Sequence, residues 1–271
     1  MCYLALLSQN RLSDILPDLV FTSHLAIVAQ DLLGFQLFGI NSGFKMAVPR
    51  GCLLVGSVPL KDTETVLTKC ADALPGRLAA IPDGETRKRI QYTQFQIPLF
   101  PQKSLAFDGK MPLSDDEVAT LTQELEQSTF ETGYDTAAFE SYEIFKRLRK
   151  EGKISKQTKF QVGIPTIGNV VGAFIKPELQ KTAEKLYEKG LFESIARLQA
   201  SIPHDDLVIQ VDMGMDLSYW EDLGKTGDYW SWVPWSAWFN DRSYVVEYLS
   251  RLINQVDPAV DLGLHYCYGT L

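Results

Sequence analysis

The stretch 52-CLLVGSVP-59 decides the fold class of this sequence. It is a short apolar run that ends at a proline, which is typical of a strand buried on both faces of a parallel sheet. Asp62 follows at the position of a helix N-cap, and apolar residues recur after it at helical spacing as far as Pro75-Gly76. The stretch therefore predicts a β-strand followed by a helix, which is the first unit of an α/β protein.

The same strand–helix unit recurs along the rest of the chain. Further apolar runs predict strands at 78-LAAIPDG-84, 160-FQVGIPT-166, 207-LVIQVDMG-214 and 260-VDLGLHYCYG-269. Helices are predicted from the capping box of Ser114 and Glu117 to about residue 130, over roughly 135–150, from Pro177 to about Ala200, and over 241–256 behind the N-cap Asn240. This alternation predicts an α/β fold with parallel strands.

Residues 1–50 differ from the sequence that follows. They are apolar and poor in charge, and they lead into 46-MAVPRG-51, a loop-like stretch that starts with methionine. Two interpretations are open: an amphipathic helical extension, or upstream sequence joined in error to a protein that begins at Met46. The predicted organisation is an atypical extension over 1–50 and an α/β domain over 51–271.

Composition and charge narrow the class of partner. The net charge of −8 and the pI near 5.0 argue against nucleic acid or an anionic membrane as the main partner. The most apolar segment, 17–40, contains two aspartates and a histidine, which disfavours a membrane span. No disulfide spacing is evident in the four cysteines, Cys2, Cys52, Cys70 and Cys267. These features predict a soluble, cytoplasmic protein.

Residues that can carry chemistry gather at the carboxyl ends of the predicted strands. They are Gly56, Ser57, Asp83, Gly84, Glu85, Thr166, Asp212, His265 and Cys267. A (β/α)₈ barrel assembles its active site at these ends. A doubly wound sheet also binds ligands there, but the turn VGSVPL lacks the G-x-G-x-x-G spacing of such sheets. A barrel is therefore the favoured architecture.

Four motifs in order, LVGSVP, PDGE, IQVD and HYCYG, carry a family resemblance. From about residue 50 to 271 the chain resembles the C-terminal catalytic barrel of cobalamin-independent methionine synthase, and stand-alone proteins related to it and to uroporphyrinogen decarboxylase. The resemblance implies a TIM barrel of the (β/α)₈ family, of which about five of eight units are present here. Residues 51–271 are then a partial methionine-synthase-like barrel.

The resemblance also implies roles for individual residues. Gly56 and Ser57 match positions that hold the carboxylate of an amino-acid substrate. Glu85 and Asp212 match the positions that bind its ammonium group and position it for catalysis. The last motif, with His265 and Cys267, matches two ligands of a zinc ion.

The reaction implied is methyl transfer from a reduced folate to a zinc-activated thiol. The family has two more zinc ligands, a Glu and a Cys on later strands, and the sequence contains no match to them. Two ligands bind zinc weakly. A truncated chain is therefore expected, with an unpaired edge at the last strand that a homo-oligomer can cover. The alternatives are a zinc-independent enzyme of the same fold, for tailoring or decarboxylation, and a truncated non-catalytic product.

Three of these assignments have a structural alternative. Glu85 lies in 83-DGETRKR-89, which can also be a solvated turn, and His265 can be a buried histidine bonded to a carboxylate beside an inert cysteine. All five tryptophans lie within 219–239. Of these, Trp230 and Trp232 are predicted to line a substrate wall, and packing against the barrel rim or a dimer partner is the alternative.

Overall fold

A computed structural model describes residues 3–7, 52–108, 112–220 and 242–267. Within a six-stranded sheet, five strands run parallel to one another in chain order, and this parallel part curls into a half-barrel that is consistent with part of a β/α barrel. The strands are β2 (Cys52–Leu53), β3 (Leu78–Pro82), β4 (Lys159–Pro165), β5 (Leu207–Met213) and β6 (Asp261–Tyr266). The predicted α/β class with parallel strands is confirmed.

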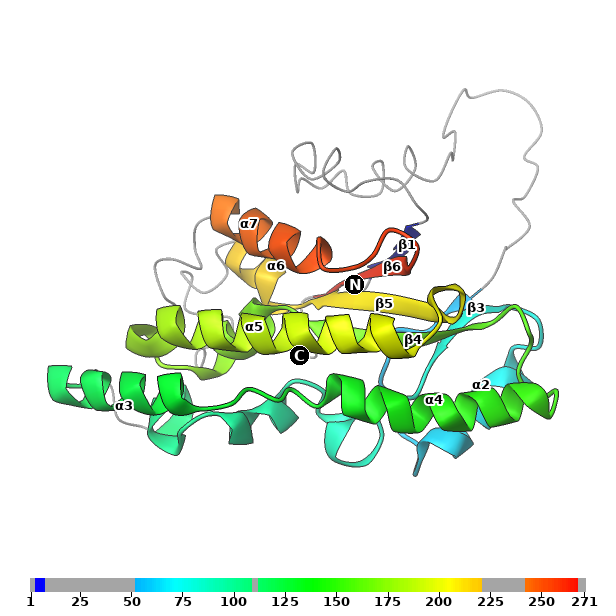
Figure 1. Ribbon diagram of the computed structural model, residues 1–271, viewed down its shortest axis with the longest axis horizontal. Coiled ribbons are helices and arrows are strands. Elements are labelled where there is room, and N and C mark those ends of the chain that lie inside the picture. Colours follow the sequence, from blue (N-terminus) through cyan, green and yellow to red (C-terminus); the bar gives the residue numbers. More distant parts are fainter. Residues whose placement is uncertain (1–2, 8–51, 109–111, 221–241, 268–271) are drawn as a thin grey trace, which may run out of the picture.

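The helices alternate with the strands, as Figure 1 shows. They are α2 (Thr63–Ala73), α3 (Asp115–Gln127), α4 (Tyr134–Lys150), α5 (Pro177–Ser201), α6 (Met215–Trp220) and α7 (Arg242–Ile253). Two predicted helix starts are confirmed, because Asp62 accepts a hydrogen bond from the Thr65 amide at 2.8 Å and Ser114 with Glu117 forms the capping box. The predicted N-cap Asn240 lies outside the described residues. Pro177 lies in the first turn of α5.

The first predicted strand is shorter than expected. Only Cys52–Leu53 pairs with β3, and the chain then leaves the sheet. The carbonyl oxygens of Leu54 and Val55 accept hydrogen bonds from side-chain amides instead, at 2.8 Å and 3.1 Å from Gln161 Nε2. Side chains of the sheet thus replace the backbone ladder at this end of the strand.

The expected unpaired edge at the last strand is wrong. Strand β1 (Tyr3–Leu7) pairs antiparallel with β6, from Tyr3 opposite Tyr266 to Leu7 opposite Leu262. Its backbone supplies hydrogen-bonding groups that the outer side of β6 otherwise leaves open. One short stretch of the predicted extension over 1–50 therefore belongs to the sheet.

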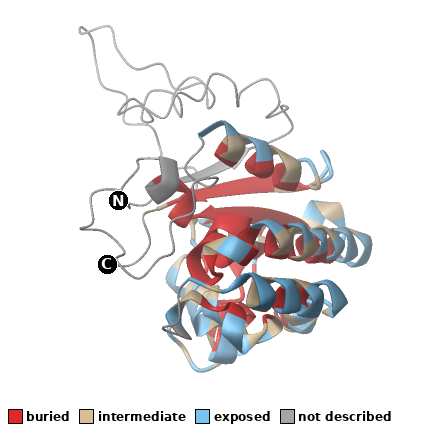
Figure 2. Cartoon of the chain, turned by 90° about the vertical axis from the view of Figure 1, so that its left-hand side faces the viewer, coloured by how far each residue is buried: buried red, intermediate tan, exposed pale blue. Residues whose placement is uncertain are grey.

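The two faces of the sheet differ in chemistry. On one face, Phe160 packs against Tyr142 and Phe145 of α4, with ring centroids 5.6 Å and 5.5 Å apart. Figure 2 shows buried residues concentrated where the sheet meets the helices. Alternation and register place a second set of side chains together on the opposite face, which is called the polar face here: Gln161, Gly163, Gln210, Asp212, Gly263 and His265.

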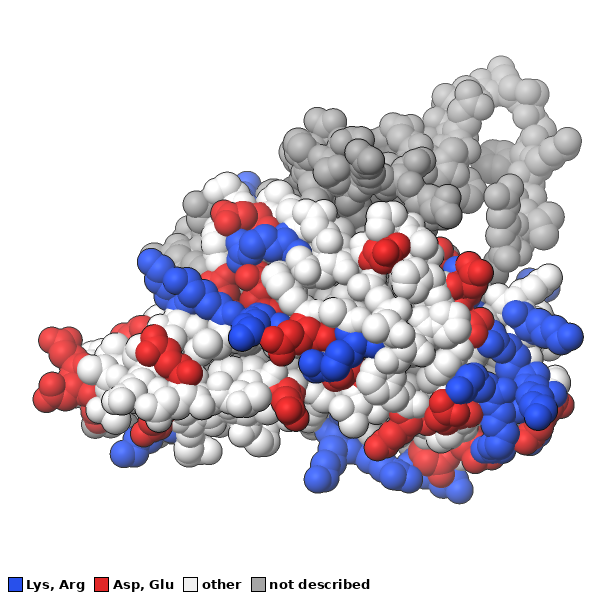
Figure 3. Space-filling view, viewed as in Figure 1, with Lys and Arg blue, Asp and Glu red and all other residues white. Residues whose placement is uncertain are grey.

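The outer surface of the helices carries charge of both signs. On the face shown in Figure 3, acidic and basic side chains are interspersed. Arg251 of α7, for example, contacts Glu184 and Glu188 of α5, each at 2.9 Å. Among the helices that the structure describes, none is long and apolar enough to cross a membrane.

Candidate functional site

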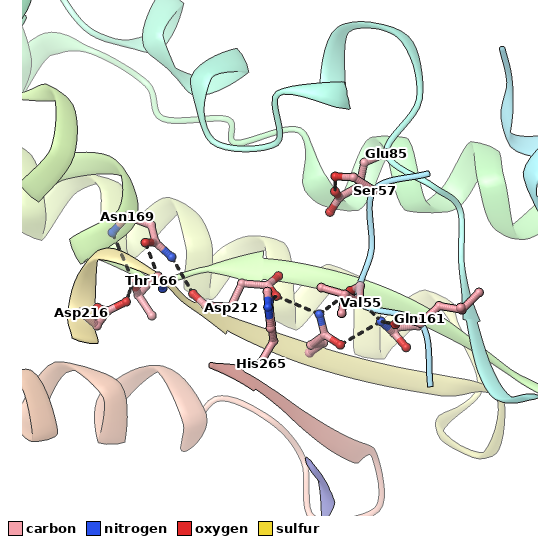
Figure 4. A network of polar contacts seen from close by, with 12 residues as sticks. Val55, Ser57, Glu85, Gln161, Thr166, Asn169, Asp212, Asp216 and His265 are labelled. Carbon is pink, nitrogen blue, oxygen red and sulfur yellow. Dashed lines mark hydrogen bonds and ion pairs between the residues drawn. The ribbon is translucent and has the colours of Figure 1, made fainter. Parts of the chain in front are cut away.

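A chain of hydrogen bonds runs across three strands on the polar face. The amide nitrogen of Gln161 on β4 donates to Gln210 Oε1 at 2.9 Å, and the Gln210 amide nitrogen donates to Asp212 Oδ1 at 2.8 Å, both on β5. The same Oδ1 lies 2.7 Å from Nδ1 of His265 on β6. Figure 4 shows this row along the strands. These hydrogen bonds fix the orientation of the Asp212 carboxylate.

The second oxygen of Asp212 and a carboxylate oxygen of Glu85 both lie close to Gly163. A Cβ atom added to Gly163 would lie 2.9 Å from Asp212 Oδ2 and 3.2 Å from Glu85 Oε1. The two carboxylates therefore approach the same point above Gly163, where the absence of a side chain leaves them room. Both residues are buried, with 6% of Asp212 and 8% of Glu85 exposed.

Glu85 is held in an uncommon backbone conformation by its own loop. Its φ angle is +50°, in the left-handed region that few residues other than glycine adopt. Its backbone amide donates to Asp83 Oδ1 at 2.9 Å, and Ser141 of α4 and Arg89 both donate to Asp83 Oδ2. Ser57 donates to Glu85 Oε2. The surroundings thus enforce a strained position, which is common at functional sites.

The two carboxylates repel each other when both are ionised, and this raises the pKa of Glu85. Burial, followed by the charge of Asp212, raises the pKa of Glu85 to about 8, although the Ser57 hydrogen bond acts in the opposite direction. Burial also raises the pKa of Asp212, against the effect of its hydrogen bond with His265. Burial therefore favours the protonated form of both carboxyls, and Glu85, with a pKa of about 8, holds a proton near neutral pH.

Four of the sequence-predicted residues lie together. Glu85 and Asp212 approach one point, Ser57 binds Glu85, and a Cβ at Gly56 would lie 3.3 Å from Glu85 Oε1. The alternative of a solvated turn is wrong for Glu85, because this side chain is buried, although the same segment does begin a short helix in which Arg89 is ion-paired with Asp83. Trp230 and Trp232 lie outside the described residues.

The predicted zinc ligands occupy the end of β6. His265 is bonded to a carboxylate through Nδ1, which is the structural alternative, and the amide of Cys267 donates to the Met213 carbonyl at 3.0 Å. Among the described residues, no group of three or more His, Cys, Asp or Glu side chains can hold a metal ion. This part of the chain therefore does not offer the ligand set that zinc prefers.

Asp216 is a further buried carboxylate near the site, and the sequence did not predict it. Thr166 donates to its Oδ2 at 2.8 Å, and Tyr248 of α7 donates to Oδ1. Burial raises the pKa of Asp216 to about 6, and these hydrogen bonds oppose the rise. Nearby, Asn169 donates to the Asp212 carbonyl at 2.7 Å from a one-turn π-helix, Gly168–Gly172. This cluster braces the end of β5 that carries Asp212.

A larger cavity lies behind the Glu85 loop. It has a volume of about 620 Å³ and is lined by residues of α2, of α4 and of the turn at 86–89. The Asp83–Arg89 ion pair connects its wall to the Glu85 loop, and neither Glu85 nor Asp212 lines it. The buried carboxylate pair, and not this cavity, therefore defines the candidate site.

Tyr92, like Asp216, was not predicted from the sequence to take part in the site. Its hydroxyl is buried and has no hydrogen-bond partner in the part of the chain that the structure describes. Burial raises the pKa of Tyr92 well above its usual range, and the charges of Asp212, Glu85 and Asp216 add to the rise. The Tyr134 hydroxyl donates to the backbone carbonyl of Tyr92 at 2.9 Å and so holds its segment in place.

Replacing Tyr92 by phenylalanine is expected to stabilise the ligand-free protein by about 1 kcal/mol, because a buried hydroxyl without a partner is costly. Tyr134→Phe is the matched control, since it removes a hydrogen bond and is expected to destabilise by about 1 kcal/mol. Urea denaturation of the two variants measures both effects. Equal destabilisation by the two substitutions contradicts the prediction.

Comparisons with known proteins add no support to the resemblance to methionine synthase, which depends on the four sequence motifs alone. No family model, no curated protein and no solved structure matches the chain. What the site can do chemically is therefore inferred from its own geometry.

Proposed function

We propose that this protein is an acid–base enzyme that binds the amino group of a small substrate, such as an amino acid, between Glu85 and Asp212. The observation that carries the proposal is the approach of two buried carboxylates to one point above Gly163. Buried carboxylates without a cation between them are costly, and an ammonium group supplies that cation. Both residues lie at or just beyond the carboxyl ends of parallel strands, and this supports the proposal because β/α-barrel enzymes carry their active sites there.

Glu85 and Asp212 have different parts in this proposal. Asp212, oriented by His265 and Gln210, is the fixed anchor for the ammonium group. Glu85 has a pKa of about 8, so it can give up and take back a proton near neutral pH. When a neutral amine binds, the proton of Glu85 moves to its nitrogen, and an ammonium–carboxylate pair results. No metal is needed for this step.

Thiol methyl transfer is the second candidate, and the family resemblance favours it. In that reading Glu85 and Asp212 hold the ammonium group of an amino-acid thiol, Gly56 and Ser57 hold its carboxylate, and a reduced folate is the methyl donor. The described residues do not complete a zinc site around His265 and Cys267. We therefore derive no step through zinc.

Calorimetric titration of the full chain tests the amine site. An amino acid and the amine that lacks its carboxylate are expected to bind, and the deaminated acid is not. At about pH 7, binding is expected to release close to one proton, because the ammonium group lowers the pKa of Glu85. Asp212→Asn is expected to weaken binding of both amines at least about tenfold, by about 1.4 kcal/mol or more. Equal binding of the deaminated acid refutes the amine site.

Metal analysis separates the two candidates. Methyl transfer is favoured if stoichiometric zinc survives dialysis. This zinc must be lost when both His265 and Cys267 are replaced by alanine, and it must be retained in Cys70→Ala. Amine binding by a protein that holds no zinc favours the acid–base enzyme.

A further inference from the structure

The cavity behind the Glu85 loop has room for a small molecule. Its volume of about 620 Å³ is typical of a small-molecule site. Hydroxyl side chains line it from three segments of the chain: Thr63, Thr65 and Thr68 of α2, Ser141 of α4, and Thr86 of the loop. Since neither Glu85 nor Asp212 lines it, an occupant of this cavity is separate from the carboxylate pair.

Two of these hydroxyl groups are free to meet an occupant. Thr86 is 6% exposed and Thr63 is 9% exposed, and neither hydroxyl makes a hydrogen bond within the part of the chain that the structure describes. Neither hydroxyl oxygen is fully enclosed, and the cavity is the space that both side chains border. Buried polar groups are nearly always paired, so two unpaired hydroxyls on one cavity wall point to a ligand.

The charges around the cavity favour an anion. Three ion pairs neutralise each other: Lys61 with Asp62 at 3.5 Å, Arg147 with Glu64 at 2.7 Å, and Arg89 with Asp83. The other charged residues of the wall are Lys69, Arg87 and Glu140, which form no ion pair with the described residues. Two positive charges therefore remain against one negative charge, which favours an anionic ligand.

Arg87 reaches the cavity through an uncommon backbone conformation. Its φ angle is +61°, in the left-handed region that few residues other than glycine adopt. Neighbouring side chains of an extended segment point to opposite sides, whereas Thr86 and Arg87 both line this cavity. Strain of this kind is common at functional sites, and here it brings a cation and a buried hydroxyl to the same space.

We propose that this cavity is a second ligand site, which binds the phosphate group of a small organic phosphate with Arg87, Thr86 and Thr63 as donors. Arginine, hydroxyl groups and the first amides of a helix are the groups that bind phosphate in proteins. Asp62 caps only the Thr65 amide, which leaves the first two amides of α2 for a ligand. The remaining volume accommodates the organic part. This site goes beyond the proposed function and does not depend on it.

Titration of the full chain with inorganic phosphate, followed by phosphorus NMR at constant ionic strength, tests the site. Every organic phosphate carries this group, so the wild-type protein is expected to bind it. Arg87→Gln is expected to weaken binding at least about tenfold and Thr86→Val about fivefold, because each removes one donor. The matched control is Lys88→Gln, which removes the same charge one residue away from the cavity wall. It is expected to bind phosphate within about twofold of the wild-type protein.

The contrast between neighbouring residues is the informative readout. A wild-type protein that does not bind phosphate overturns the proposal. An equal loss of affinity in Lys88→Gln and Arg87→Gln also overturns it, because the anion is then held by diffuse surface charge. Should Arg87→Gln fail to fold, Thr86→Val decides, since this isosteric change removes a hydroxyl without a hydrogen bond to the described residues. Unchanged affinity in Thr86→Val then places the anion elsewhere.

Discussion

Replacing Glu85 by glutamine is expected to make the folding stability of the protein much less dependent on pH. The pKa of Glu85 rises from a usual value of 4.5 to about 8 in the folded protein. Between these values the folded state holds a proton that the unfolded state has lost, so the free energy of unfolding falls as pH rises. This stability is fully present below 4.5 and is lost as pH rises through about 8. The loss is on the order of a few kcal/mol.

Urea denaturation between about pH 5 and about pH 9 measures this effect. Glu85→Gln and the wild-type protein are expected to have similar stability at the acid end, and the variant is expected to be the more stable at the alkaline end. Burial also raises the pKa values of Glu184 and Asp216, to about 7 and about 6, so a residual slope remains in the variant. Glu140→Gln, on the exposed side of α4, is the control and should follow the wild-type curve. Parallel curves for all three proteins would show that Glu85 is not protonated when folded.

The elements that could be predicted from the sequence are those with local signals. Asp62 and the Ser114–Glu117 box cap helices through hydrogen bonds that span three residues, so the chain itself contains the information. The five parallel strands show as apolar runs between these helices. The pairing of Tyr3–Leu7 with β6 could not be predicted in the same way, because it joins opposite ends of the chain.

The sequence could indicate which residues form the site, but not which of them are hydrogen-bonded to one another. Gln161, Gly163, Gln210 and Asp212 alternate with apolar residues in 160-FQVGIPT-166 and 207-LVIQVDMG-214, and this period of two indicates a polar face. Described only as apolar runs, these stretches predict strands without predicting the polar face. Which amide meets which carboxylate depends on strand register, and register is fixed by tertiary structure.

The burial of Glu85 shows the same limit. The run 83-DGETRKR-89 has the composition of an exposed turn, yet the loop folds over with Glu85 at a positive φ angle and its carboxylate buried. Asp83 holds the Glu85 amide from within the same loop, and Ser57 holds its carboxylate from a distant segment of the chain. Local propensity opposes this conformation, so only the assembled structure can reveal it.

Gly163→Ala is expected to abolish amine binding while leaving the protein folded. The new Cβ would lie 2.9 Å from Asp212 Oδ2, a contact closer than side chains tolerate, and 3.2 Å from Glu85 Oε1. Asp212 cannot easily move away, because Gln210 and His265 both hold its Oδ1. The methyl group therefore separates the carboxylates and occupies the place of the ammonium group. We expect a loss of affinity of at least about tenfold and a destabilisation of about 1–3 kcal/mol from overpacking.

Gly263→Ala is the control that separates overpacking from loss of the site. Gly263 lies on the same polar face, on the strand next to that of Asp212, and the three atoms nearest to a Cβ there all belong to Gln210, the first at 3.3 Å. It is expected to cost stability and to preserve amine binding within about threefold, or about 0.7 kcal/mol. If Gly163→Ala binds the amine as well as Gly263→Ala does, the space above Gly163 is not where the ligand lies. If only Gly163→Ala loses binding, the ligand requires the point at which Glu85 and Asp212 meet.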